Sequence, residues 1–172
     1  VAADCRLIGM DLAALTDHRL YDPSPEAIRA FEGCPHDLTL LPGEEVHPPD
    51  NPVHMVHVGG SAGVNAMFDD AHRREVDAIV AGLGTSLSPA DARALASCLW
   101  VFRRIREVGG IGILAHPCWF THQAWNVSEP VQAGLYARSP FDALEVIGGY
   151  YAFQHESNTL QVARWQEERT RG

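Results

Sequence analysis

Short apolar stretches alternate with longer amphipathic ones along the whole chain. The apolar stretches are five to seven residues long, the length of a buried strand, and they cover residues 10–16, 38–43, 53–58, 111–115 and 143–147. The longer stretches carry apolar side chains at helical spacing and predict helices over 24–32, 69–83, 89–108, 131–138 and 157–170. Strand alternating with helix, without internal repeats, predicts one α/β domain over residues 1–172 with a mainly parallel sheet. Serine before proline with an acid in the first turn predicts N-caps at Ser24 and Ser88.

One pair of neighbouring strands is predicted to be antiparallel. A turn cluster of proline, aspartate and asparagine at residues 48–52 separates Glu45 from the apolar stretch that begins at Val53. A hairpin over residues 44–57 would bring His54 opposite Glu45. Because side chains alternate along a strand, His57 is expected to point to the other face of the sheet from His54.

Most of the apolar stretches deliver a metal-capable side chain near their ends. His18 follows the first stretch, Glu45 the second and His116 the fourth, while His54 lies within the third. Histidine and carboxylate side chains gathered at strand ends are typical of the metal centre of an α/β barrel. Since imidazole and carboxylate together suit Zn, Mn or Fe, we expect divalent ions of this kind, with one carboxylate bridging two of them.

Each candidate also has a structural interpretation. Asp17 and His18, like Glu44 and Glu45, could simply be turn residues on the surface, and His116 could be a buried histidine whose ring nitrogens are hydrogen-bonded. A metal role is favoured for His116 because the proline that follows it ends the strand and fixes the backbone. The weaker metal candidates are His47 in the turn, His57 on the opposite face and His122 in an aromatic loop over 117–130.

Aromatic residues follow the last two apolar stretches. Trp119 and Tyr150, together with His122, are predicted to line a substrate rim suited to a planar group. The alternative is that these aromatic side chains pack over the mouth of the fold without contacting a substrate.

Composition removes several classes of function. The 13 basic residues are all arginine, which excludes a P-loop lysine, a Schiff-base lysine and a carbamylated lysine within this sequence. The net charge of -9 makes a nucleic-acid-coating surface improbable, because phosphate binding relies on clustered basic residues. No apolar stretch approaches the ~20 residues of a membrane span, so no membrane partner is expected.

The four cysteines are widely separated and form no C-x-x-C motif. This spacing predicts free thiols and a cytoplasmic protein rather than a disulfide framework. The first residues lack both an initiator methionine and a signal-peptide pattern, so the sequence is expected to be an internal segment of a longer gene product.

Four short motifs together resemble the successive motifs of the PHP (polymerase and histidinol phosphatase) superfamily. They are Leu15-Thr-Asp-His18, Pro42-Gly-Glu-Glu45, Val53-His-Met-Val56 and Leu114-Ala-His-Pro117, in that order. The stretch from Glu145 to Tyr151 and the later Glu156-Ser-Asn158 are also similar to the last third of PHP-type phosphoesterases. The resemblance implies a distorted (β/α)7 barrel that is incomplete at both ends here, because the opening H-x-H and closing D-x-H motifs have no counterpart.

The resemblance also implies roles for four residues. Two or three divalent ions would be bound in the complete protein, with His18, Glu45, His54 and His116 as ligands and Glu45 as the bridge. Glu45 and His116 are accordingly the catalytic candidates. The function implied is a metal-dependent phosphoesterase that acts on a small phosphomonoester or nucleotide through a metal-activated water.

Three alternatives remain open at this point. A polymerase-associated type of nuclease is disfavoured by the acidic balance. A non-catalytic module could keep the fold after losing metal ligands. An amidohydrolase-like enzyme is more distant, because its common bimetallic form needs the missing lysine. The sequence leaves the oligomeric state and the substrate undetermined.

Overall fold

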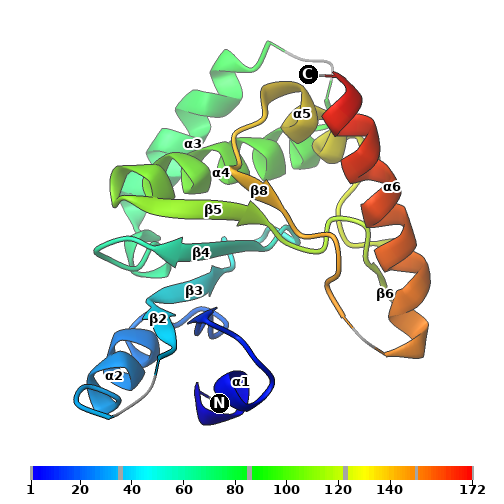
Figure 1. Cartoon of the computed structure of the whole chain (residues 1–172). Coiled ribbons are helices and arrows are strands. Elements are labelled where there is room, and N and C mark those ends of the chain that lie inside the picture. The colour runs from blue at the N-terminus through cyan, green and yellow to red at the C-terminus, as the bar shows by residue number, and fades with distance from the viewer. Residues whose placement is uncertain (1, 35–36, 85–86, 122–123, 150, 172) are drawn as a thin grey trace.

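A computed structural model describes residues 2–34, 37–84, 87–121, 124–149 and 151–171 (Figure 1). The centre of the molecule is a four-stranded sheet in the order β3-β4-β5-β8, formed by Gly43–Val46, Met55–Gly59, Gly110–Leu114 and Ala143–Leu144. None of the described helices is both long and apolar enough to cross a bilayer.

The sheet is mixed rather than mainly parallel. Strand β4 runs antiparallel to both β3 and β5, and only the β5–β8 pairing is parallel. The prediction of a mainly parallel sheet is therefore wrong for the described residues. A run of apolar residues shows that a strand is buried but not which way it runs, so the direction of β4 relative to β5 had no signature in the sequence.

The predicted hairpin forms, but its register places Val56, and not His54, directly opposite Glu45. Glu45 pairs with Val56 and Glu44 pairs with His57. Because alternate residues share a face, His54 lies diagonally across from Glu45 on one face, whereas Glu44 and His57 lie on the other. Neighbouring acids in the sequence are thus sent to opposite sides of the sheet.

The N-terminal region forms a second, smaller sheet beside β3. Helix α1, Ala2–Leu7, was not predicted; it precedes β1, Leu12–Ala14, which pairs in parallel with β2, Thr39–Leu41, across the connecting helix α2, Pro23–Ala30. The chain after β1 then runs along the edge of β3. The backbone N–H of Arg19 donates to the carbonyl of Glu45 at 2.9 Å, and the N–H of Glu45 donates to the carbonyl of Asp17 at 2.9 Å.

Helices cover one face of the central sheet. They are α3, Asp70–Gly82, α4, Pro89–Glu107, and α5, Glu129–Arg138, while α6, His155–Arg171, forms a separate arm (Figure 1). The core includes Leu95, Phe102, Leu114 and Leu135, all essentially inaccessible to solvent. Each such side chain contributes about 1.5–3 kcal/mol through burial, so this layer holds the strands that carry the polar residues.

The remaining departures from prediction are local. Ser88 caps α4 by accepting from the N–H of Asp91 at 3.1 Å, as expected, whereas Ser24 lies inside α2 and its hydroxyl accepts from the N–H of Gly43 at 3.0 Å. The aromatic loop contains a small hairpin, β6 (Phe120–Thr121) with β7 (Ala124–Trp125). The described strands form an open four-stranded sheet and two separate two-stranded ribbons, β1 with β2 and β6 with β7. The distorted (β/α)7 barrel that the resemblance implied is therefore not present as a closed barrel among them.

Candidate metal centre

Glu45 lies at the centre of a cluster of imidazole rings. Its Oε1 is 3.0 Å from Nδ1 of His54, 3.1 Å from Nε2 of His47 and 3.7 Å from Nε2 of His116. Its other oxygen, Oε2, is 3.5 Å from Nε2 of His18. The structure therefore brings the four sequence-predicted ligands together and adds His47, which the sequence favoured less.

Each of these side chains comes from a different part of the fold. Glu45 belongs to β3, His54 immediately precedes β4, His116 follows β5, and His18 belongs to the segment that runs along the edge of β3. Gly43 makes this meeting possible, because a Cβ there would lie 2.6 Å from the carbonyl oxygen of His57 and 2.9 Å from the side chain of Thr16. Only glycine lets β3 begin so close to both neighbours.

The ring nitrogens of His54 and His116 face each other. Nδ1 of His54 is 3.0 Å from Nε2 of His116, so at most one hydrogen can lie between them and the other nitrogen must present a lone pair. A lone pair on imidazole, directed at a shared point beside a carboxylate, is what a metal ligand requires.

Glu145 fixes which nitrogen of His116 carries the hydrogen. Its Oε2 lies 3.0 Å from Nδ1 of His116 and also accepts from the backbone N–H of the same residue. A carboxylate can only accept, so Nδ1 is the donor and, in the neutral ring, Nε2 is left free to bind an ion. No motif assigns this role to Glu145, although an acid inside an apolar strand stretch indicates that its carboxylate needs a polar partner.

The corner predicted at His116-Pro117 is present and is strained. His116 has a φ of 30°, in the left-handed region that non-glycine residues rarely adopt. Beyond it, the carbonyl of Pro117 accepts from Nε2 of Gln132 at 3.0 Å. Such strain persists only where surrounding contacts hold it, and it concentrates at functional sites.

Electrostatics around the cluster favour a charged Glu45 and a neutral His47. Burial would raise the pKa of Glu45, but the hydrogen bond with His54 and favourable interactions with His116 and His18 outweigh it and lower that pKa to about 2. Burial, followed by repulsion from His54, lowers the pKa of His47 to about 4. At neutral pH these are an ionised carboxylate and a neutral imidazole, the forms that bind metal.

A second glutamate–histidine pair lies on the opposite face of the same two strands. Nδ1 of His57 is 3.2 Å from Oε1 of Glu44, and both side chains are completely buried. Gly110 confines the ring, because a Cβ at that position would lie 2.3 Å from Nε2 of His57. Burial would raise the pKa of Glu44, but hydrogen bonds from His57, Val64 and Asn65 lower it.

Asn65 connects this buried pair to the metal cluster. Its Nδ2 donates to Oε2 of Glu44 at 2.7 Å and to the backbone carbonyl of Glu45 at 3.1 Å. Its Oδ1 accepts from the backbone N–H of His47 at 3.1 Å. One amide therefore holds three positions of the β3 segment, two of which belong to the cluster.

The aromatic rim is only partly within the described residues. Trp119 stacks on His116, with ring centroids 4.2 Å apart at 29°, and within the described part of the chain its indole nitrogen is buried without a hydrogen-bond partner. His122 and Tyr150, the other two predicted rim residues, lie outside the described residues.

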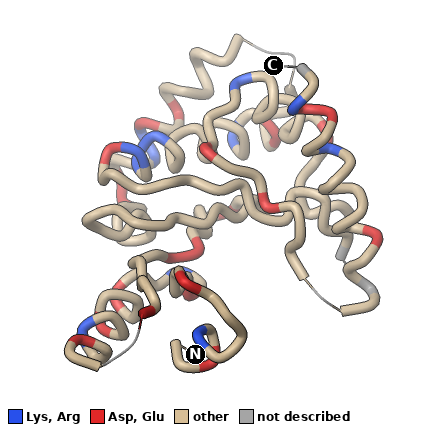
Figure 2. The backbone as a smooth tube through the Cα atoms, in the orientation of Figure 1, with Lys and Arg blue, Asp and Glu red and all other residues tan. Residues whose placement is uncertain are grey.

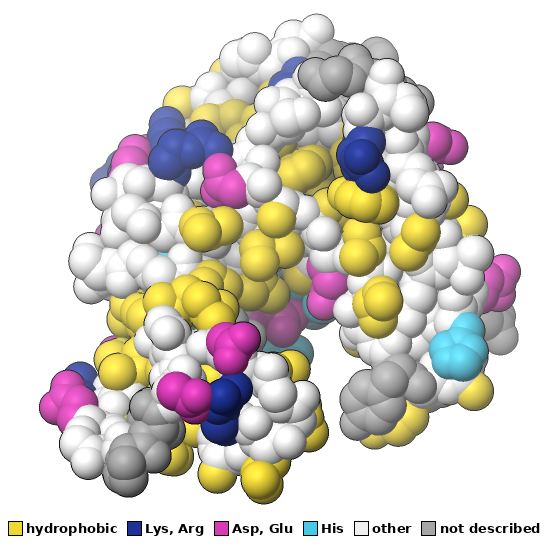
Figure 3. All heavy atoms as spheres, in the orientation of Figure 1, with side chains coloured by type: hydrophobic (Ala, Val, Ile, Leu, Met, Phe, Trp, Pro, Cys, Tyr) yellow, Lys and Arg dark blue, Asp and Glu magenta, His cyan; other side chains and the backbone are white. Residues whose placement is uncertain are grey.

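The cluster opens into a hollow. Figure 3 shows histidine and acidic side chains together at the floor of a depression between the N-terminal region and the α6 arm. Apart from Arg19, the arginines belong to helices, and Figure 2 shows this basic charge away from the central strands. The hollow therefore has no arginine-lined groove of the kind that tracks a nucleic-acid backbone.

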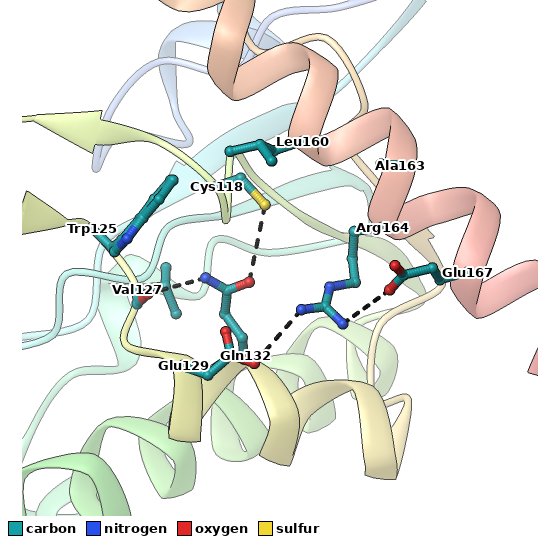
Figure 4. A pocket seen from close by; sticks show the side chains of 9 residues that line it. All are labelled: Cys118, Trp125, Val127, Glu129, Gln132, Leu160, Ala163, Arg164 and Glu167. Atoms are coloured by element: carbon teal, nitrogen blue, oxygen red, sulfur yellow. Dashed lines mark hydrogen bonds and ion pairs between the residues drawn. The ribbon is translucent and has the colours of Figure 1, made fainter.

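A separate cavity of about 270 Å³ lies between β7, α5 and α6 (Figure 4). Arg164 at its edge is already paired with Glu129 at 3.6 Å and Glu167 at 3.2 Å. Gln132 in its wall donates to the carbonyls of Pro117 and Val127. These contacts support the backbone after His116, so we assign the cavity wall a structural role.

The donor set fits a divalent ion. Two groups of three residues, His18–Glu45–His47 and Glu45–His54–His116, each offer ligand atoms within 4.8 Å of one another. Ligands of one Zn²⁺ ion, bound at about 2.0–2.2 Å, lie up to roughly 4 Å apart, so small side-chain rotations suffice for coordination. Nitrogen and carboxylate donors suit Zn, Mn or Fe.

Comparison with known proteins gives a likeness of fold. No family model matches the sequence, and no curated protein matches it. Among solved structures, the chain is similar to a candidate metal-dependent phosphoesterase from Bifidobacterium adolescentis, with a TM-score of 0.60 and 16% identity over 98% of this chain and 77% of that one. The two proteins share a fold. This finding confirms, for the fold, the resemblance to a metal-dependent phosphoesterase that the four motifs indicated.

All four cysteines are free thiols, as the sequence predicted.

Proposed function

We propose that this protein is a metal-dependent phosphoesterase of the PHP type that acts on a small phosphomonoester or nucleotide. The convergence of Glu45, His54 and His116 carries the proposal, because their ligand atoms lie 3.0–3.7 Å apart although the residues are far apart in sequence. The shared fold with a candidate metal-dependent phosphoesterase supports it.

The residues would divide the work as follows. Glu45 and His116 hold the ions through a carboxylate and an imidazole that Glu145 orients, and His18 and His54 complete the ligand set. When bound, divalent ions supply positive charge beside the phosphoryl oxygens and lower the pKa of a bound water. Trp119, which stacks on His116, would place an aromatic side chain beside the reacting group. His122 and Tyr150 remain proposed rim residues.

The direct test is phosphate release from p-nitrophenyl phosphate after loading with Zn²⁺, Mn²⁺ or Fe²⁺. Glu45→Gln should lose both bound metal and turnover, because a neutral amide is a poor bridging ligand. His155→Asn, which changes an exposed histidine at the start of α6, should retain both. A fully metallated protein that hydrolyses no phosphoester, including nucleotides, would contradict the proposal.

A non-catalytic PHP-like module is the second candidate, favoured by the open form of the described sheet. That reading predicts a melting temperature unchanged by chelators, whereas bound metal adds stability. A nuclease of the polymerase-associated type would instead show salt-dependent DNA binding.

A further inference from the structure

The cluster around Glu45 contains more ligands than one ion needs. Four imidazole nitrogens lie within 3.7 Å of its two carboxylate oxygens. They fall into two groups of three that share Glu45, one with His54 and His116 and the other with His18 and His47. A catalytic zinc ion commonly has three protein ligands and one open position, so this set is sufficient for two such sites that share a carboxylate.

We propose that His47 is a ligand of a second divalent cation, together with His18 and Glu45. This inference rests on the proposed metal dependence and extends it to a residue that neither the motifs nor the shared fold assigns. It also makes each of the two sites a set of two histidines and one glutamate.

The placement of His47 supports a ligand role. Its Nε2 is 3.1 Å from Oε1 of Glu45, while Nε2 of His18 is 3.5 Å from Oε2 of the same carboxylate. The His47 and His18 rings lie 4.8 Å apart at 52°, and the ligand atoms of His18, Glu45 and His47 all lie within 4.8 Å of one another. Both rings could therefore coordinate one ion after only small side-chain rotations.

The ring of His47 is also held in place. Its side chain is only 9% exposed and stacks on His54 with ring centroids 3.8 Å apart. Asn65 accepts from its backbone N–H, which fixes the chain just beyond β3. A side chain that is already ordered loses little conformational entropy when it binds an ion, unlike the surface turn residue that the sequence suggested.

The competing explanation is that His47 only donates a hydrogen bond to Glu45. His47→Gln separates the two, because the glutamine amide can still donate to the carboxylate but is a poor ligand for a transition metal. His47→Ala removes both properties. His116→Ala removes a ligand of the first site alone, and His155→Ala is a matched control outside the cluster.

The experiment is a Co²⁺ titration of metal-free protein, read by the visible absorption of bound Co²⁺ and by elemental analysis after free ion is removed. Circular dichroism establishes that each variant is folded. The expected result is two equivalents for the wild type and His155→Ala, and one for His47→Ala, His47→Gln and His116→Ala. His47→Gln should lose the ion of the second site, and His116→Ala should lose the ion of the first. The Co²⁺ absorption spectra of the two variants should therefore differ, because each reports a different site.

Two results would overturn the inference. If His47→Gln keeps two equivalents with unchanged affinity, His47 is a hydrogen-bond donor and not a ligand. If the wild type binds one ion and His47→Ala binds it equally well, the second site does not exist, although the proposed phosphoesterase can still stand on the first. A wild type that binds no ion would instead remove the proposed function itself.

Discussion

The hairpin of β3 and β4 presents the same pair of side chains, a glutamate and a histidine, on each of its faces. On one face Glu45 and His54 are partly open and surrounded by further imidazoles, whereas on the other Glu44 and His57 are completely buried. The open glutamate has too many nitrogen neighbours for a single pairing. The buried one is satisfied by His57, Val64 and Asn65.

The difference shows that residue type alone does not decide function. A buried glutamate–histidine pair whose carboxylate already accepts its hydrogen bonds stabilises the fold. Removal of either partner leaves the other buried without a hydrogen-bond partner, which costs several kcal/mol of folding free energy. The same pair at an open edge, with further imidazoles around it, forms the candidate metal site. Strand alternation is enough to give adjacent acids these two roles.

The largest expected effect is that substituting Glu44 mainly lowers stability, whereas substituting Glu45 mainly removes metal binding. Glu44→Ala leaves His57 and the N–H groups of Val64 and Asn65 without their partner, so it should lower the free energy of unfolding by roughly 3–5 kcal/mol. Glu45→Ala should lower the stability of the metal-free protein by less than Glu44→Ala does, and by at most the roughly 3 kcal/mol that the lowered pKa of Glu45 implies, while abolishing metal binding. Urea unfolding in the presence of a chelator measures both, and equal losses for the two variants would end the distinction between the faces.

Acid should act on the open face in two steps. In the metal-free protein His47 titrates at about 4 instead of near 6.5, so the unfolded chain takes up a proton first and stability falls as pH drops from 6.5 to 4. Glu45, with its pKa lowered to about 2, contributes stability above pH 4.5 that is lost as pH falls towards 2. Each step amounts to at most about 3 kcal/mol.

The variants separate these two steps. His47→Asn should flatten the stability profile between pH 6.5 and 4, and Glu45→Gln should flatten it below pH 4.5. Chemical unfolding across this range provides the measurement. A wild-type profile that is level down to pH 4 would show that His47 is not held neutral by its surroundings.

The smallest expected effect concerns Glu145, which supports His116 on the open face as Glu44 supports His57 on the buried one. Glu145→Gln should weaken metal binding by about 10–100-fold, the usual cost of losing a carboxylate behind a ligating histidine. Unfolding of the metal-free protein should change little. Glu129→Gln, which alters a carboxylate 75% exposed and paired with Arg164, is the control, and equal affinities for the two variants would remove the role of Glu145.

Local sequence signals predicted most of the helices and strands but little of how the strands pair and which segments contact one another. Helical periodicity and the Ser88 cap located α4, and the turn cluster located the hairpin that places Glu45 and His54 on the same face. Helix α1 was missed because it is short and lacks a clear apolar stripe. Ser24 was misread because a serine near a helix start can equally accept from a distant strand, here from Gly43.

The sequence predicts those residues of the candidate centre that lie at or near the end of an apolar strand stretch. His18, Glu45, His54 and His116 carried that signal, but His47 was discounted because it lies beyond a strand end that the sequence placed in a turn. Asn65 could not be identified, since its contacts join segments about 20 residues apart that only the fold brings together.

The backbone pairing between His18 and Glu45 has a mechanical consequence. The N-terminal ribbon with its two helices meets the central sheet along this short edge and through two hydroxyls, because Tyr21 donates to the carbonyl of Gly60 and Ser24 accepts from the N–H of Gly43. An ion bound by His18 on one side and by Glu45 on the other would link the N-terminal ribbon to the central sheet. Saturation with metal should then protect the ribbon from proteolysis and slow its amide exchange, while stripping the ion would loosen the first quarter of the chain and leave the rest folded.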